Sequence, residues 1–228
     1  KAMLAVLQHP DFVWVPLSLE EVLRVSGNVG LKQSEGLFSK KNLGLAGPYC
    51  DDLLMVGVEK REGAVKLHLL PVEVKIGQTG AGVVAKAQEQ GKHTADALRT
   101  FLTPKVESFR TRFYRTFFAK LAIAAAQRFA LYGLVPEQDW SVLTADLRCE
   151  LLNDDYEICW DLAQPVGEFA VLCFSSGAIA RSLSRSENCL MVELLESDGA
   201  SHLGMGVGEL HNLYAGSDST INESLLLC

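Results

Sequence analysis

The sequence predicts an α/β protein in which helices flank a mixed β-sheet. Apolar runs of strand length recur at residues 53–58, 65–76, 156–160, 169–174 and 190–195, and two helical patterns separate the first pair from the rest. With 228 residues, of which 48% are apolar and 21% charged, the chain is long enough to bury a core without disulfides or a structural metal.

The first quarter of the chain predicts one helix, one loop and one hairpin. Ser18 with Glu21 three residues later forms a capping-box pattern, which predicts a helix over residues 18–25. Residues 26–50 are rich in glycine, serine, lysine and asparagine and predict a long loop. Apolar runs at 53–58 and 65–76, joined by the turn-like residues 60–63, predict a β-hairpin.

Two helices are predicted next, over residues 83–101 and 105–131. Pro104 separates them, and Gly133 and Pro136 end the second. Phe109, Phe113 and Phe117 recur every four residues, so they fall on one helical face, and we expect that face to pack in the core.

The remainder predicts further sheet and then an extension. Strands are expected over 156–160, 169–174 and 190–195, with a short helix over 178–183. Residues 197–224 are rich in glycine, serine and asparagine. We therefore expect a domain over residues 1–200, with residues 201–228 forming a linker or an extension toward a further domain.

Charge and hydropathy exclude several classes of protein. A net charge of −7 and a pI near 5.3 argue against a protein that coats nucleic acid with its whole surface. The longest apolar stretch, residues 121–135, is interrupted at Gln127 and Arg128, too early for a membrane span. The first residues lack the pattern of a signal peptide, and the six cysteines form no CxxC pair. These features predict a cytoplasmic protein that does not associate with membranes.

One predicted strand carries two charges among apolar residues. In Pro71-Val72-Glu73-Val74-Lys75-Ile76, alternation places Glu73 and Lys75 on one face and the three aliphatic side chains on the other. Burial of such charges costs several kcal/mol unless they are paired or bind an ion. The arrangement therefore indicates a site, or else an exposed ion pair on the surface of the hairpin.

The hairpin register brings a second carboxylate to this strand. If the turn centres near Glu62-Gly63, the numbers of paired residues sum to about 125, and Asp52 faces Glu73. A turn one residue earlier would pair Asp52 with Pro71 but would keep the two carboxylates close. Asp51 is a weaker alternative because neighbouring residues of a strand point to opposite faces.

Two carboxylates and a lysine suit a hard cation and a phosphate. Mg²⁺ accepts one or two carboxylates, retains water and binds phosphate oxygens. A lysine beside it can position a water molecule and offset the negative charge that grows on the phosphorus oxygens. No nucleotide-binding glycine motif occurs, and the five histidines have no metal-ligand spacing.

These residues resemble a known family. Gly47-Pro48-Tyr49-Cys50-Asp51-Asp52-Leu53-Leu54 followed by Glu73-Val74-Lys75 is similar to the PD-(D/E)xK nuclease superfamily, whose restriction-endonuclease-like core is a mixed sheet with a hairpin, flanked by helices. The resemblance implies that Asp52 and Glu73 bind Mg²⁺, or Mn²⁺ in its place, and that Lys75 is the catalytic lysine.

The same resemblance implies two further site residues. RecB-like members have a glutamine in the helix that follows the lysine strand, and here Gln90 is the first choice and Gln88 the second. Some members add an acidic residue from the first helix, which would be Glu21, although the capping box already accounts for a glutamate there. The chain departs from the RecB-like pattern at Thr94, where an aromatic residue is frequent.

The wider segments around the motif resemble nuclease-like parts of bacterial defence proteins that also carry a DNA-translocating ATPase, including those of phosphorothioation-dependent restriction. This likeness implies DNA as a partner, a role in restriction or antiviral defence, and further subunits or domains that include an ATPase.

A basic segment offers a surface for DNA. Residues 99–128 contain seven basic residues against one acid, a local net charge of +6. Arg99, Lys105, Arg110, Arg112 and Arg115 are the predicted backbone contacts. The alternative is a solvated helix face whose phenylalanines are simply core.

The sequence thus predicts a Mg²⁺-dependent DNA endonuclease or nickase. A catalytically inactive nuclease fold that binds DNA or a partner subunit for an attached motor is the main alternative. A phosphoesterase acting on small molecules is a third, which no compact pocket motif supports.

Overall fold

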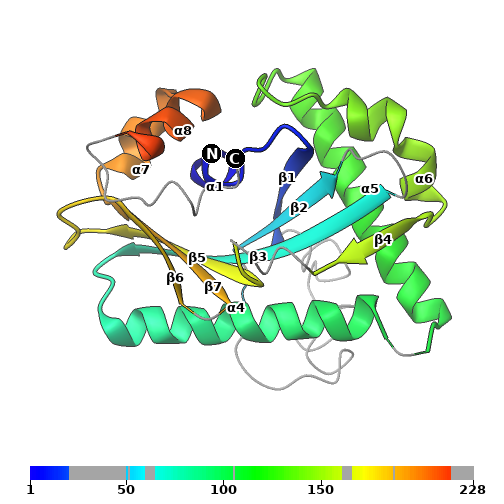
Figure 1. Ribbon diagram of the computed structural model, residues 1–228, viewed down its shortest axis with the longest axis horizontal. Coiled ribbons are helices and arrows are strands. Elements are labelled where there is room, and N and C mark those ends of the chain that lie inside the picture. The colour runs from blue at the N-terminus through cyan, green and yellow to red at the C-terminus, as the bar shows by residue number, and fades with distance from the viewer. Residues whose placement is uncertain are drawn as a thin grey trace, which may run out of the picture.

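The protein was analysed as a computed structural model, which describes residues 1–20, 50, 52–59, 65–104, 106–160, 166–186 and 188–216. It is an α/β fold with a seven-stranded mixed sheet flanked by helices, which confirms the predicted fold class (Figure 1). The strand order is β1-β2-β3-β5-β7-β6, and β4 pairs with β3 beside this path.

Three antiparallel strands begin the sheet. The strands β1 (Phe12–Ser18), β2 (Leu53–Glu59) and β3 (Val65–Gly77) form a meander. Leu53 pairs with Val72 and Glu59 with Lys66. The partner numbers sum to 125 in both pairs, so the predicted hairpin register is confirmed.

Parallel strands extend the sheet from β3. The strand β4 (Tyr156–Cys159) pairs with the first residues of β3, and β5 (Phe169–Ser175) pairs with its last six. The strand β7 (Cys189–Leu195) lies parallel to β5, and β6 (Ser182–Ser186) closes the edge in antiparallel orientation.

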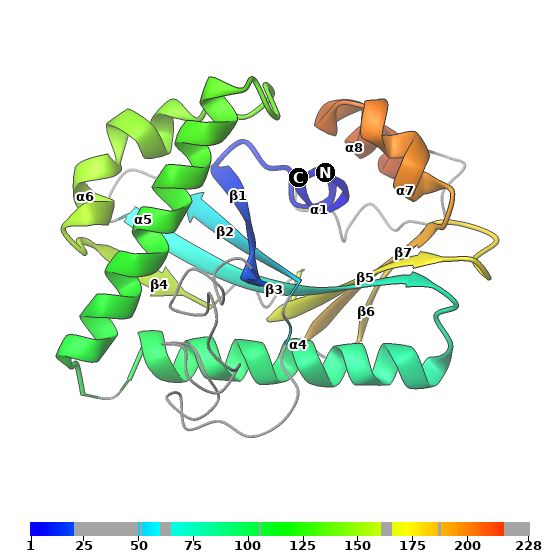
Figure 2. The ribbon, with the colours of Figure 1, turned by 180° about the vertical axis from the view of Figure 1, so that it is seen from behind.

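Helices cover both faces of the sheet. The long helices α4 (Ala81–Leu102) and α5 (Phe109–Leu131) pack on one face with η1 (Val142–Asp146) and α6 (Arg148–Leu152). The opposite face carries α1 (Ala2–Val6), α7 (Asp198–Ser201), η3 (His202–Gly204) and α8 (Val207–Ala215) (Figure 2). Among the described residues, no helix has both the length and the apolar character needed to cross a bilayer.

Alternation along the central strands divides the core between the two faces. Leu67 and Leu69 of β3 pack toward α4 and α5, whereas Leu70 and Val72 pack toward α1 and α8. Residue 73 follows the first set, so the odd-numbered side chains of β3 face α4. This geometry decides where the charged side chains of β3 lie.

The predicted helix over 178–183 is wrong. Residues 179 and 180 form a bend, and Ser182–Ser186 is the edge strand β6. Leu183 is buried whereas Ser184 is exposed, which is the period of two of a strand.

The prediction that residues 201–228 are a linker or extension is wrong for residues 201–216. Val207, Leu210 and Tyr214 of α8 are buried in the core on the α1 side of the sheet. Their spacing of three and four residues is that of an amphipathic helix. Residues 217–228 lie outside the described part of the chain.

Near the N-terminus the structure differs from the expected helix over 18–25. Ser18 is the last residue of β1, residues 19 and 20 are helical, and residues 21–25 lie outside the described residues. Strand β1 was not predicted, because Pro16 interrupts its pattern. An edge strand tolerates proline, since one side of it forms no ladder hydrogen bonds.

The helix predicted from residue 105 begins at Phe109. Ser108 is its N-cap, and the Ser108 hydroxyl oxygen accepts a hydrogen bond from the Thr111 amide at 3.2 Å. The expectation that Phe109, Phe113 and Phe117 are all core is wrong for two of them. Phe109 is 86% exposed and Phe113 is 40% exposed, whereas Phe117 packs against the core.

Candidate active site

The open end of the β2–β3 hairpin brings Asp52 to β3. Leu53 pairs with Val72, so Asp52 precedes the first ladder pair and lies opposite the next residue, Glu73. The Val74 amide donates a hydrogen bond to Asp52 Oδ2 at 2.7 Å. This bond fixes the Asp52 carboxylate against the strand that carries Glu73 and Lys75.

Glu73 and Lys75 lie on one face of β3 and form an ion pair between Glu73 Oε1 and Lys75 Nζ. Glu73 is 1% exposed, whereas the Lys75 side chain is 26% exposed. The predicted placement of Glu73 and Lys75 on one face of the strand is confirmed. Among the described residues, Glu73 Oε2 is buried and has no hydrogen-bond partner.

The charge of Glu73 is held in an unfavourable environment. Burial raises the pKa of Glu73, and the nearby negative charge of Asp52 acts in the same direction. The Lys75 ammonium and the Cys50 thiol act against this rise in pKa. A cation placed between Asp52 and Glu73 would favour the ionised form of Glu73 and would provide a partner for Glu73 Oε2.

The two carboxylates fit a Mg²⁺ ion in donor type. Asp52 and Glu73 supply oxygen ligands, which Mg²⁺ prefers, and Glu73 Oε2 is a buried acceptor that lacks a donor among the described residues. Nowhere in the described part of the chain are three or more histidine, cysteine or acidic side chains grouped to hold a metal. An ion at this place would therefore take its other ligands from water and a phosphate.

Cys50 and Thr94 connect this end of the hairpin to α4. The Cys50 amide donates to Thr94 Oγ1 at 2.8 Å, and the Cys50 thiol donates to the Val72 carbonyl at 3.1 Å. Burial raises the pKa of the Cys50 thiol, and the charge of Glu73 raises it further, so Cys50 is a neutral thiol rather than a nucleophile.

Gln90 lies one helical turn before Thr94, and the Thr94 hydroxyl donates to the Gln90 carbonyl at 3.0 Å. Thr94 contacts Cys50, and Cys50 contacts Val72, so Gln90 lies one turn from the part of α4 that is joined to the open end of the hairpin. Gln88 instead donates to Met191 Sδ on β7 at 3.6 Å.

Glu21 and Lys105 lie outside the described residues, as does Asp51. Two residues around the site were not predicted from the sequence. Thr94, which the sequence shows only as a departure from a family pattern, is a structural contact of the site. Glu193 of β7 pairs with Cys173, the residue that pairs with Lys75. The alternating pattern of β7 was visible, but only the strand order places Glu193 on the face of Lys75.

The basic residues of the predicted DNA surface are partly committed to contacts within the protein. Arg99 Nη2 lies 2.9 Å from Glu168 Oε1, and its guanidinium lies over the Trp160 ring. The Arg110 guanidinium lies over the Phe101 and Tyr114 rings, 5.7 Å from each centroid.

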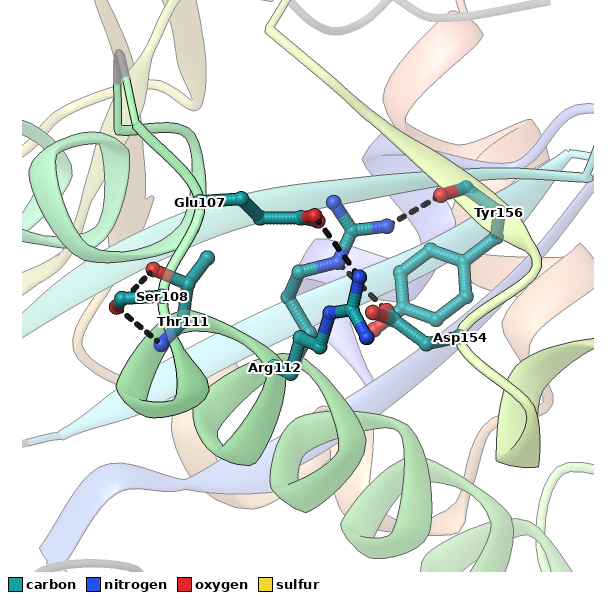
Figure 3. A network of polar contacts seen from close by, with 7 residues as sticks. Glu107, Ser108, Thr111, Arg112, Asp154 and Tyr156 are labelled. Atoms are coloured by element: carbon teal, nitrogen blue, oxygen red, sulfur yellow. Dashed lines mark hydrogen bonds and ion pairs between the residues drawn. The ribbon is translucent and has the colours of Figure 1, made fainter.

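The two remaining arginines differ in burial. Arg112 pairs with Glu107 at 3.2 Å on the surface, close to the Ser108–Thr111 cap (Figure 3). Arg115 Nε contacts Asp154 Oδ1 at 2.6 Å, and Arg115 Nη2 donates to the Tyr156 carbonyl. With 15% of its side chain exposed, Arg115 has little surface left for a phosphate.

Comparisons with models of protein families, with curated proteins and with solved structures found no match to this chain.

Proposed function

We propose that this chain is a Mg²⁺-dependent deoxyribonuclease of the PD-(D/E)xK type that hydrolyses phosphodiester bonds as an endonuclease or nickase. The observation that carries the proposal is the meeting of Asp52, Glu73 and Lys75 at the open end of the hairpin, with one oxygen of Glu73 buried and lacking a partner among the described residues.

The proposed chemistry assigns one task to each side chain. Asp52 and Glu73 would hold the divalent ion, which supplies Lewis acidity and an acidified water. Lys75, whose ammonium is partly exposed, would orient the attacking water and offset the charge that develops on the phosphate oxygens. Gln90, one helical turn before Thr94 on α4, would orient Lys75 or a phosphate oxygen.

The biological setting belongs to the same proposal. The likeness of the motif segments to parts of bacterial defence proteins supports a role in restriction or antiviral defence, in the cytoplasm, with an ATPase as a further subunit or domain. DNA is the proposed substrate and partner.

A catalytically inactive module that binds DNA or a partner subunit is the second candidate. It is favoured by the ion pair between Glu73 and Lys75, which satisfies one carboxylate oxygen without a metal. Only the enzyme requires a divalent ion between Asp52 and Glu73.

Plasmid cleavage separates the two candidates. Supercoiled plasmid is incubated with Mg²⁺ or Mn²⁺ and the wild-type chain, the Lys75→Ala variant or the Lys66→Ala variant. Lys66 is the matched control, because it lies on the same strand but at the other end of the hairpin. We expect nicking by the wild type and Lys66→Ala and a loss of at least about 100-fold in Lys75→Ala. Equal nicking by all three, or none by the wild type, would contradict the enzyme.

A further inference from the structure

The N-terminal half of α5 exposes aromatic side chains to solvent. Phe109 is 86% exposed and Phe113 is 40% exposed, and the Phe113 ring stacks on that of Phe117 with a centroid separation of 6.4 Å. Large aromatic side chains are normally buried, and neighbouring exposed ones mark a surface that binds a partner.

Cationic side chains lie on the same face of α5. Each residue turns the helix by about 100°, so Phe113 and Lys120 lie within about 40° of Phe109, and Arg112 lies about 60° to its other side. Arg112 and Lys120 are both exposed. We call these four residues, Phe109, Arg112, Phe113 and Lys120, the aromatic face.

All charged side chains of α5 are basic. Residues 109–131 contain five basic residues and no acidic residue, in a chain whose net charge is −7. The acid nearest to the aromatic face in the described contacts is Glu107, which pairs with Arg112 across exposed side chains (Figure 3). Such a surface pair contributes little and exchanges readily for another anion.

We propose that the aromatic face binds single-stranded nucleic acid, with bases stacked on Phe109 and Phe113 and phosphates near Arg112 and Lys120. Stacking on a ring requires a base whose own face is free, as in an unpaired strand, and alternation of rings and cations is typical of surfaces that bind single strands. An acidic peptide would meet the cations but would offer no planar faces to the rings.

This inference rests on the proposed function for the choice of DNA as the ligand, and it deepens that function by naming the form of DNA. The face begins at Phe109, seven residues after α4 ends at Leu102. Gln90 lies 12 residues before Leu102, about 18 Å along α4. A strand of several nucleotides can therefore reach both the aromatic face and the candidate active site.

Fluorescence anisotropy tests the proposal in EDTA, so that no cleavage occurs. The probes are a labelled 15-nucleotide oligo-dT, a duplex of the same length and a poly-glutamate peptide. The variants are Phe109→Ala, the double variant Phe109→Ala/Phe113→Ala, Lys120→Gln and the control Ile179→Ala. Ile179 is fully exposed and lies outside α5, so it matches the loss of an exposed apolar side chain.

Wild type and Ile179→Ala are expected to bind oligo-dT more tightly than duplex or peptide. The double variant should weaken oligo-dT binding at least tenfold, and Phe109→Ala by a smaller factor, because stacking of each base contributes about 1–3 kcal/mol. The slope of log affinity against log salt should be unchanged in these two variants and reduced by about 0.7 in Lys120→Gln. Phe109 is so exposed that its removal does not threaten folding.

Two results would overturn the inference: oligo-dT affinity unchanged in the double variant, or a wild type that prefers the duplex or the peptide. Failure of the proposed function is distinguishable from either. A wild type that binds oligo-dT through the aromatic face but never cleaves plasmid with Mg²⁺ would contradict the enzyme alone.

Discussion

Two buried glutamates on the β2–β3 hairpin, Glu59 and Glu73, have different surroundings. Glu59 lies at the turn end, where Oε2 is 3.2 Å from His68 Nε2 and 4.0 Å from Lys66 Nζ. Glu59 and His68 are both buried, and the Phe12 ring packs against the His68 ring. Glu73 lies at the open end beside a partly exposed lysine, and one of its oxygens lacks a described partner.

A buried acid beside a base is not by itself a site. The Glu59 carboxylate contacts His68 and Lys66, so it contributes to the structure of the hairpin. The Glu73 cluster has a second carboxylate, a partly exposed cation and an unsatisfied oxygen. These additional features, rather than burial, point to a ligand.

The largest expected contrast is in cleavage. Glu73→Gln removes a proposed metal ligand, so plasmid nicking should fall by about 100-fold or more, whereas Glu59→Gln should keep it within about threefold. The measurement is the initial rate of nicking at saturating Mg²⁺. Similar losses in both variants would remove the distinction between the two clusters.

For the free energy of unfolding, we expect the larger losses at the Glu59 cluster. His68→Leu removes the 3.2 Å contact between the buried Glu59 carboxylate and the His68 ring, and we expect it to lower the free energy of unfolding by about 2–4 kcal/mol. Lys66→Leu should cost less than about 1 kcal/mol, because its contact is long and its side chain is one-third exposed. Urea denaturation measures both, and equal costs would show that the His68 contact contributes nothing special.

The Thr94 hydroxyl supports only the Glu73 end of the hairpin. Thr94→Val leaves the Cys50 amide without its acceptor and should cost about 1–3 kcal/mol, whereas Thr94→Ser should retain most of the stability. Because Cys50 lies two residues before Asp52, we also expect Thr94→Val to weaken Mn²⁺ binding while Thr94→Ser restores it. Unchanged Mn²⁺ affinity in Thr94→Val would show that the hydrogen bond between Cys50 and Thr94 does not contribute to ion binding.

The smallest effect is a gain in stability. Since the pKa of Glu73 is raised in the folded protein, its ionisation opposes folding, and the stability it contributes at low pH is lost as pH rises from the unfolded-state pKa through the folded-state pKa. Glu73→Gln should therefore raise the free energy of unfolding by about 1 kcal/mol at pH 7 without metal. The Lys75 ammonium loses its ion-pair partner in this variant, but its side chain is 26% exposed, so water can hydrate it.

The gain should shrink as the pH falls through the unfolded-state pKa of Glu73 and vanish near pH 3, where Glu73 is protonated in both states. Thermal denaturation of wild type and Glu73→Gln at the two pH values checks this. A variant less stable than the wild type at pH 7 would contradict the assigned cost of the Glu73 charge.

The hairpin could be predicted from the sequence because its information is local. Two apolar runs and a short turn fix the register, and the register fixes that Asp52 lies opposite Glu73. The face of α5 could not be predicted. The four-residue spacing shows that Phe109, Phe113 and Phe117 lie on one side of the helix. It does not show that only Phe117 packs against the core.

Other parts were missed for different physical reasons. The polar residues of β6 hid a strand whose only buried apolar side chain is Leu183. Glycines and serines concealed α8, although the spacing of Val207, Leu210 and Tyr214 is helical. Thr94 reaches the site through a contact between distant segments, and only the strand order places Glu193 on the face of Lys75, so no local pattern encodes either.

Calorimetric titration with Mn²⁺ at pH 7 tests most directly whether Asp52 and Glu73 hold a divalent ion. The wild type and Glu59→Gln are predicted to bind one ion with the same affinity, and Asp52→Asn and Glu73→Gln to lose that binding. Binding that survives in Glu73→Gln, or a wild type that takes up no ion, would contradict the account.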